Sequence, residues 1–284
     1  MGGESTQRYS ISQSLLLCSP LLLLLFIFYL YPLLKLLPES LYSGNKLSLE
    51  HYRHFFTASL YPKVLVRTIR ISFLVTIICF ITGYPLAFFL AEIKNPKISG
   101  LLLACVVLPL CTSTLVRTYS WVVLFQDHGV INRFLLAVHL IKEPLQVLYT
   151  EFAVLVGMVH VLLPLMILPI YSVLKNLDRN LIRAARNLGA SNFWIFTMVI
   201  FPLSLPGVGA GVMFVFILAL GFYITPAVLG GPRTMMISTL IEYQVNRLLN
   251  WDFAAAIAFM LLLTTVIMIV AFNKIVGLDK LYSE

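Results

Sequence analysis

The stretch Leu181-Ile-Arg-Ala-Ala-Arg-Asn-Leu-Gly-Ala-Ser-Asn-Phe-Trp-Ile-Phe-Thr-Met-Val-Ile-Phe-Pro202 links two long apolar runs of the chain. Asp178 stands where it can cap a helix that runs to Leu188, and Gly189 supplies the stop. The pattern predicts a short helix at a surface, a turn, and then a helix that enters an apolar environment. The Ala184-Ala185 pair gives the short helix a small face that a partner protein can hold in a groove, although an ordinary interfacial helix has the same features.

The apolar residues of the chain gather in long runs. Of the 284 residues, 60% are hydrophobic and 11% are charged, which is too little charge to cover the surface of a soluble domain. Runs of about 20 residues match helices that cross a hydrocarbon core of roughly 30 Å. Every backbone amide inside a bilayer needs a partner within the protein, so these runs have to be helices. We therefore predict an all-α transmembrane fold built as one integral domain.

Six apolar runs are long enough to cross a membrane. The first is too long for the apolar part of a signal peptide and no cleavage motif follows it, so we interpret it as an uncleaved span. The spans form one domain over residues 15–276, between tails at 1–14 and 277–284, and a polar loop at about 175–199 precedes the fifth. The predicted spans are residues 15–37, 64–91, 100–125, 151–174, 196–224 and 253–276.

The net charge of +8 does not indicate nucleic-acid binding. The basic residues are scattered through loops and span ends, and no dense basic stripe alternates with aromatic residues. We expect them to face lipid headgroups and partner proteins. An even number of spans puts both termini on one side of the membrane. Because the loops on the two sides carry nine and eleven basic residues, charge alone leaves the orientation open.

Catalytic and metal-binding constellations are missing from the sequence. The four cysteines lie in apolar segments without C-x-x-C spacing, and His51 and His54 have no cluster of carboxylates or cysteines beside them. We find no nucleophile–base set at a workable spacing, and no G-x-x-x-x-G-K-[ST] loop that would bind nucleotide phosphates. We therefore expect a protein that is not an enzyme and binds no cofactor itself.

Two features inside the spans concern packing. Gly207, Gly209 and Gly211 predict that the fifth span approaches a neighbouring helix closely. His160 lies in the middle of the fourth span, where a hydrogen bond to a neighbouring helix is the expected use of its ring.

The polar loop resembles the coupling-loop signature of permeases in ATP-binding-cassette importers. That signature is Glu-Ala-Ala, three residues, Gly, six residues, Phe, two residues, Ile, one residue and Leu-Pro. Val199 and Phe201 replace its Ile and Leu, and Arg183 replaces its Glu, which reverses the charge at the first position. The residues that match at the right spacing are Ala184, Ala185, Gly189, Phe196 and Pro202.

The resemblance implies the six-helix, MetI-like architecture of a type I importer permease in the bacterial cell inner membrane. It implies that the loop docks a cytoplasmic ATPase through Arg183, Ala184, Ala185, Gly189 and the adjacent Ala190, so that both termini are cytoplasmic. It also implies three kinds of partner. These are a second permease chain of a different sequence, two ATPase subunits that bind ATP and Mg, and an external solute-binding protein.

The likeness extends over nearly the whole chain and is strongest to permeases of spermidine/putrescine importers. Similar permeases also serve ferric iron, phosphonates, opines and amino acids, so the family is better defined than the solute. The segments that carry the likeness are Gly83–Ala91, Leu115–Trp121, Gly129–Asn132, Gly221–Pro232 and Trp251–Ala256.

Polar and aromatic residues near the ends of the spans are candidates for the translocation pathway. An amine would be attracted by aromatic faces and carboxylates through cation–π and charge contacts. An ordinary interfacial aromatic belt, with charges that contact the binding protein, explains the same residues. The candidates are Arg117, Tyr119, Trp121, Asp127, Tyr223, Glu242 and Asp252.

An ion-coupled secondary transporter is the main alternative among transport proteins. Such proteins carry acidic residues in the middle of the membrane and often have repeated, broken half-helices. The central parts of the predicted spans contain no acidic residue, so we favour the ATP-driven importer.

Overall fold

The computed structural model describes residues 11–43 and 46–276, and they are almost entirely helical. The predicted tails at 1–14 and 277–284 fall outside the described residues, except for the first turn of α1. A two-residue antiparallel ladder pairs Tyr42 with Leu47 and Ser43 with Lys46. The elements are α1 (Ile11–Leu25), the π-helical η1 (Phe26–Leu30), α2 (Tyr31–Leu41), β1 (Tyr42–Ser43), β2 (Lys46–Leu47), α3 (Glu50–Thr57), α4 (Leu60–Glu92), α5 (Pro96–Val107), the 3₁₀ turn η2 (Leu108–Cys111), α6 (Thr114–Phe125), α7 (Val130–Ala137), α8 (Glu151–Lys175), α9 (Arg179–Asn187), α10 (Asn192–Ile195), the π-helical η3 (Phe196–Ile200), α11 (Phe201–Leu220), α12 (Ile224–Leu229), the 3₁₀ turn η4 (Pro232–Thr234), α13 (Ile237–Asn246) and α14 (Trp251–Val276).

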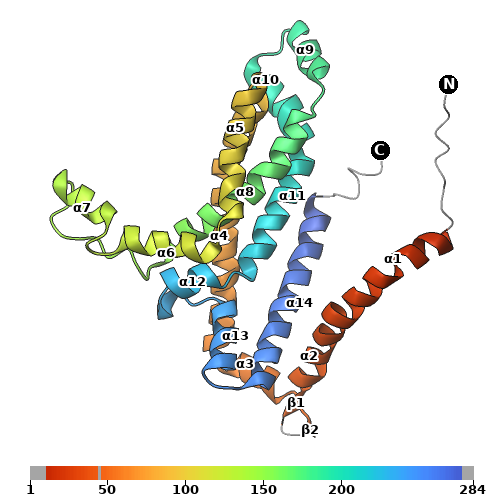
Figure 1. Ribbon diagram of the computed structural model, residues 1–284, viewed down its shortest axis with the longest axis vertical. Helices are drawn as coiled ribbons and strands as arrows, with labels where there is room; N and C mark the ends of the chain where they lie inside the picture. The colour runs from red at the N-terminus through yellow and green to blue at the C-terminus, as the bar shows by residue number, and fades with distance from the viewer. Residues whose placement is uncertain (1–10, 44–45, 277–284) are drawn as a thin grey trace.

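Four long apolar helices form the body of the structure (Figure 1). They are α4, α8, the continuous helix Asn192–Leu220 that contains α11, and α14, and each is long and apolar enough to cross a membrane. The end of the bundle that carries α9 is called the α9 end below. The end that carries α3 and α13 is called the opposite end (Figure 1). This arrangement confirms the all-α fold with apolar spans.

The core lies around α8, which packs against both α4 and α11. Its side chains at Val154, Met158, Leu162 and Met166 are at most 1% exposed. They recur every four residues, which places them along one side of the helix. The fourth predicted span is therefore the central helix of the bundle.

Small residues allow α11 to approach α8 as closely as the sequence predicts. A Cβ atom on Gly207 would lie 2.8 Å from the carbonyl oxygen of Pro169, and one on Gly211 would lie 3.0 Å from that of Met166. Because these neighbours are backbone atoms, neither position has room for a side chain. Gly83 on α4 faces Met166 in a similar way, at 3.2 Å.

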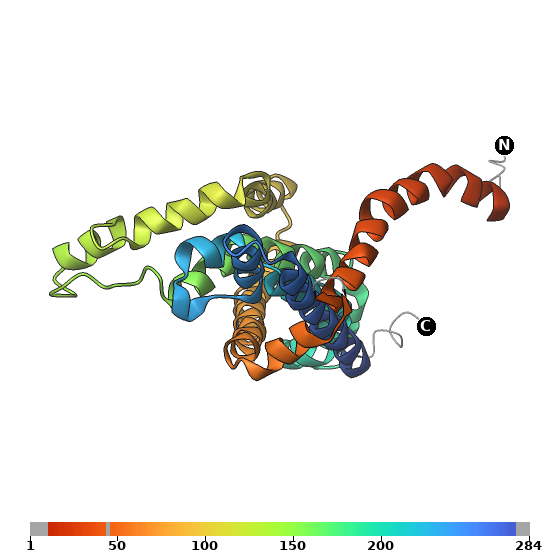
Figure 2. The ribbon, with the colours of Figure 1, turned by 90° about the horizontal axis from the view of Figure 1, so that it is seen from below.

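The predicted span over residues 100–125 is not one straight helix. The helix α5 and the turn η2 run along the bundle, but the chain then bends by 95° before α6 begins at Thr114. Pro109 cannot continue the hydrogen-bond ladder. The hydroxyl of Thr112 donates to the carbonyl of Pro109 at 2.8 Å, which satisfies the broken end. Figure 2 shows α6 and α7 as an arm that projects from one side of the bundle.

The first predicted span is a helical arm on the other side of the bundle. Helices α1 and α2 join through η1, and α2 packs against α14. The apolar portion Leu17–Leu30 is shorter than the four long helices. Its side chains are largely exposed, with Phe28 at 76%, and Figure 2 shows α1 pointing away from the other helices.

Candidate functional sites at the two ends of the bundle

The loop at the α9 end folds as its local sequence predicts. The Asp178 carboxylate accepts a hydrogen bond from the Asn180 amide at 2.9 Å and caps α9. Gly189 ends the helix at a φ of 82°, a conformation that glycine adopts at little cost. The Gly189 amide donates to the Arg186 carbonyl at 3.0 Å and the Ala190 amide donates to the Ala185 carbonyl at 3.1 Å. These paired bonds form a Schellman motif, so both helix boundaries are confirmed.

The two sides of α9 face different surroundings. Ile182, Ala185 and Ala190 are half-buried and pack against the core, while Arg183 and Ala184 are exposed. Ala185 therefore holds the helix to the bundle in addition to any role in docking. Arg183, the departure from the family signature, faces outward.

An exposed leucine on this loop escaped the sequence analysis. Leu188 is 88% exposed and Leu181 is 46% exposed. Single exposed leucines are common on protein surfaces, so these two add apolar area to the exposed face of the loop without identifying a partner. A look for apolar residues within the coupling motif would have found both.

Phe196 and Pro202 belong to the bundle side of the loop. The Phe196 ring lies 5.9 Å from the Tyr84 ring and 5.8 Å from the Phe88 ring, both edge to face. The Tyr84 hydroxyl is hydrogen-bonded to the Ser204 hydroxyl at 3.0 Å. Pro202 lies directly after the π-helical turn η3, where the helical hydrogen-bond ladder is already irregular. These residues join the loop to α4 and α11.

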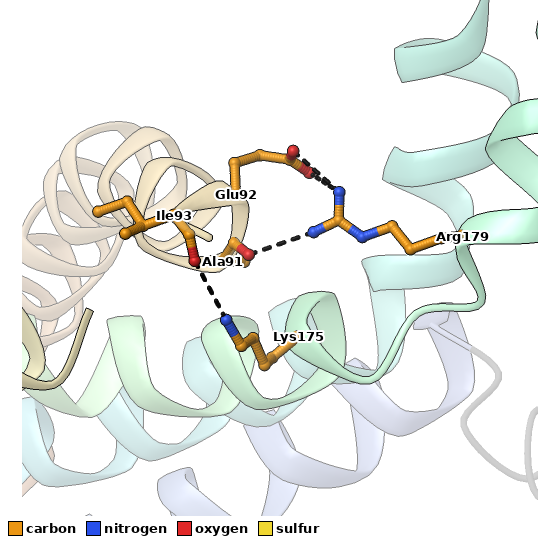
Figure 3. A network of polar contacts seen from close by, with 5 residues as sticks. All are labelled: Ala91, Glu92, Ile93, Lys175 and Arg179. Atoms are coloured by element: carbon orange, nitrogen blue, oxygen red, sulfur yellow. Dashed lines mark hydrogen bonds and ion pairs between the residues drawn. The ribbon is translucent and has the colours of Figure 1, made fainter. Parts of the chain in front are cut away.

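A polar network ties the start of α9 to the end of α4 (Figure 3). One guanidinium nitrogen of Arg179 donates to the two carboxylate oxygens of Glu92 at 2.7 and 2.9 Å, and another donates to the Ala91 carbonyl at 3.2 Å. The Lys175 ammonium donates to the Ile93 carbonyl at 3.5 Å. The terminal carbonyls of α4 thus receive cationic donors, which the partial negative charge of a helix C-terminus favours. We call this set, Glu92 and Arg179 with Lys175, the α9 clamp.

The pathway candidates on α6 contact α8 and their own turn. The Trp121 indole donates to the His160 ring at 3.0 Å and stacks on Phe125 at 5.0 Å. This hydrogen bond confirms that His160 bonds to a neighbouring helix. Arg117 donates to the Thr112 carbonyl at 3.3 Å and to the Thr114 hydroxyl at 3.2 Å. Its Nε and Nη1 atoms are buried without a partner among the described residues.

The remaining candidates are dispersed. Tyr119 and Asp127 are exposed on and just after α6. Tyr223 lies in the connection between α11 and α12, not late in the fifth span as predicted, because α11 ends at Leu220 before Gly221. Glu242 on α13 accepts from Asn246 at 3.2 Å, and Asp252 lies in the first turn of α14. The polar contacts of Arg117, Trp121 and Glu242 are made to other residues, not to one another.

Comparison with known proteins identifies the family. The model of the binding-protein-dependent transport system inner membrane component matches residues 83–274. The chain belongs to this family. The match begins near the end of α4 and ends within α14, so it covers the α6–α7 arm, α8, the coupling loop, α11 and most of α14. The protein is accordingly an importer permease, a transport component and not an enzyme.

Two named permeases and one solved transporter are similar to this chain and support the family assignment. The spermidine/putrescine transport system permease protein PotB of Haemophilus influenzae is 39% identical over 214 residues, which is 75% of this permease and 73% of the relative. The Escherichia coli protein of the same name is 34% identical over 213 residues, 75% and 77% of the two chains. A crystal structure of a bacterial alginate ABC transporter, in complex with an alginate pentasaccharide-bound periplasmic protein, contains a similar chain. The TM-score is 0.76 at 18% identity, with 93% and 94% of the two chains covered.

Proposed function

We propose that this permease imports a polyamine, with spermidine and putrescine as the first solutes to test. The names of the relatives at 34–39% identity support this choice. The alginate transporter has the same fold, so fold does not select the solute, and ferric iron, phosphonates, opines and amino acids are the alternatives. The exposed Tyr119, Tyr223 and Asp127 suit an amine, whereas the cationic Arg117 does not. Arg117 then supports the structure of the bent arm rather than contacting the solute.

The α9 end is the proposed cytoplasmic docking site for the ATPase. Its capped helix, with Arg183, Ala184 and Leu188 exposed, is the observation that carries this assignment. The chain then has both termini in the cytoplasm. ATP and Mg are bound by the two ATPase subunits, and a second permease, different in sequence, completes the pathway. A solute-binding protein delivers the polyamine at the opposite end.

Transport by the assembled importer tests this function. The permease is reconstituted in proteoliposomes with the ATPase and the second permease encoded beside it, and uptake of labelled spermidine is measured with the solute-binding protein and ATP. We expect uptake to stop when the phosphate-binding lysine of the ATPase is replaced. Uptake that persists with the inactive ATPase contradicts the importer assignment. Titration of the solute-binding protein with polyamines, amino acids and ferric iron then decides the solute.

A further inference from the structure

Cationic side chains gather where α4 begins, at the opposite end of the bundle. Lys63, Arg67 and Arg70 follow one another at intervals of four and three residues, so they lie on one face of the helix. Arg233 joins them from η4, and Glu151 from the start of α8. With Pro62 and Val66 these residues line a cavity of about 560 Å³, which we call the cationic cavity.

The cavity has more positive charge than the protein neutralises. Glu151 is the one acidic residue among those that line it, and its carboxylate pairs with Arg70. None of the ion pairs in the described part of the chain includes Lys63, Arg67 or Arg233. Lys63 also lies in the first turn of α4, where the helix dipole disfavours a cation. An anion from outside the chain would balance these charges.

The uncharged part of α4 places the cavity at a membrane surface. Residues 71–91 contain no charged side chain and extend about 30 Å at 1.5 Å per residue, the thickness of a hydrocarbon core. Arg70 therefore lies at the edge of the hydrocarbon. Arg67 lies about 5 Å further out, at the depth of the lipid headgroups.

The same face of α4 continues into the hydrocarbon layer as an exposed apolar stripe. Phe73, Ile77 and Ile81 follow Arg70 at helical spacing and are 57%, 36% and 61% exposed. Phe73 also borders an apolar groove of about 260 Å³ that side chains of α4, α11 and α14 line. Cations above an apolar stripe match the two parts of one phospholipid, its phosphate and its acyl chains.

We propose that the cationic cavity is a binding site for an anionic phospholipid, whose headgroup phosphate contacts Lys63, Arg67 and Arg233 and whose acyl chain lies along the α4 stripe. An acidic protein surface would be attracted by the same cations, but it would make no use of the stripe below them. The site depends on the chain crossing the membrane and is independent of which solute is transported.

The test measures lipid binding to the full-length permease. The protein is placed in nanodiscs of phosphatidylethanolamine with increasing fractions of photoreactive phosphatidylglycerol, and the labelled peptides are mapped. We expect saturable labelling of the segments around residues 63–70 and 232–234. The double variant Arg67→Gln/Arg233→Gln should need roughly tenfold more phosphatidylglycerol for half-saturation. The single variant Arg233→Gln should need several-fold more phosphatidylglycerol for half-saturation. Because Arg233 lies in an exposed turn, this change leaves the helices intact.

A matched control separates a site from a general charge effect. Arg133→Gln/Lys142→Gln removes the same charge from exposed positions at α7 and after it, and labelling should be unchanged. Equal loss in the test and control variants overturns the proposal. So does displacement of the label by inorganic phosphate at millimolar concentration, which would indicate a phosphate site without a lipid. Cross-linking of these cations to the solute-binding protein, with no lipid labelling, overturns it in favour of an acidic protein surface.

Discussion

At the α9 end, both carboxylate oxygens of Glu92 accept hydrogen bonds from Arg179, whereas at the opposite end Glu151 pairs with Arg70 among three further cations. Both ion pairs join α4 to α8 or to the loop that follows it, and both carboxylates are partly exposed. At the α9 end Glu92 and Arg179 balance each other, and cationic donors also reach the terminal carbonyls of α4, while Arg183 and Arg186 on α9 stay exposed. In the cationic cavity one carboxylate faces four cations.

Helix dipoles explain why the two ends are not equivalent. Helices α4 and α8 both end near α9, where their partial negative charge favours Lys175 and Arg179. At the opposite end both helices begin, and their partial positive charge favours Glu151 but not Lys63. The first arrangement holds a helix in place without outside help. The second leaves three cations to water or to an anion from outside the chain, so we expect the lipid phosphate at this end and not at the α9 clamp.

The largest effect should come from breaking the loop at the α9 end. Gly189→Asp puts a carboxylate on a residue with a φ of 82°, a conformation that aspartate tolerates better than most residues, and its negative charge is repelled by the partial negative charge of the helix C-terminus. No atom lies within 4 Å of the added Cβ, so membrane insertion should remain intact. We expect transport to fall more than about tenfold, measured as spermidine uptake at equal membrane abundance.

Gly189→Asn is the control for this change. Asparagine accepts the left-handed conformation better than most residues and adds no charge, so it should retain most of the transport activity. Normal uptake by the aspartate variant contradicts the docking assignment. Loss of the protein from the membrane in either variant would instead show a role in folding.

The second effect concerns the α9 clamp. Glu92→Arg places two cations side by side and should lower transport roughly two- to fivefold, because an exposed pair contributes about 0.2–1 kcal/mol and reversing one charge turns attraction into repulsion. The double variant Glu92→Arg/Arg179→Glu restores the pair and should recover most of the activity. The number of ATP molecules hydrolysed per solute transported should rise in the single variant. In the double variant it should return to the value of the unmodified permease.

The matched control lies at the opposite end of the same helices. Arg70→Glu and Arg70→Glu/Glu151→Arg alter an ion pair of similar exposure and should leave the ratio of ATP hydrolysed to solute transported unchanged. If they change this ratio as much as the clamp variants do, the two ends do not differ in the way that their contacts indicate.

The elements that could be predicted are those with local signals. The boundaries of α9 follow from Asp178 and Gly189, which act on amides and carbonyls within the same few residues. The apolar run of α8 predicts a helix, but its central position could not be predicted, because α14 is at least as apolar and far less buried. The α9 clamp could not be predicted, because Glu92 and Arg179 are 87 residues apart and each is an ordinary surface charge in the sequence.

The bend after α5 shows a limit of counting apolar residues. The mean hydropathy of residues 100–125 is that of one span. However, Pro109 and the polar Thr112-Ser113-Thr114 mark the position where the helix bends. Trp121 and His160 illustrate the same limit for the pathway. Their hydrogen bond depends on how α6 crosses α8 after the bend, which residue spacing within either helix does not contain.

Trp121 tests whether the α6–α7 arm is structural or part of the pathway. Trp121→Phe keeps the stacking on Phe125 but removes the indole donor that bonds His160. We expect a loss of about 1 kcal/mol of stability, seen as a lower melting temperature of the purified permease, with an unchanged KM for the solute. Val123→Ala is the control, since Val123 lies on the same helix and is 54% exposed. A raised KM for Trp121→Phe would place Trp121 in the pathway.

The smallest effect should come from Glu151, the carboxylate in the cationic cavity. Glu151→Gln leaves Arg70 unpaired, so the cavity gains a fourth uncompensated cation. An exposed pair of this kind contributes about 0.2–1 kcal/mol, and we therefore expect about two- to threefold tighter binding of phosphatidylglycerol, measured in the nanodisc titration. The amide keeps the size of the side chain and its place in the first turn of α8. If Glu151 only lowers the positive charge of the cavity, removing its carboxylate strengthens lipid binding. If the Glu151–Arg70 pair instead holds the cavity in shape, removing the carboxylate weakens lipid binding. Weaker binding by Glu151→Gln would therefore show that the pair is structural.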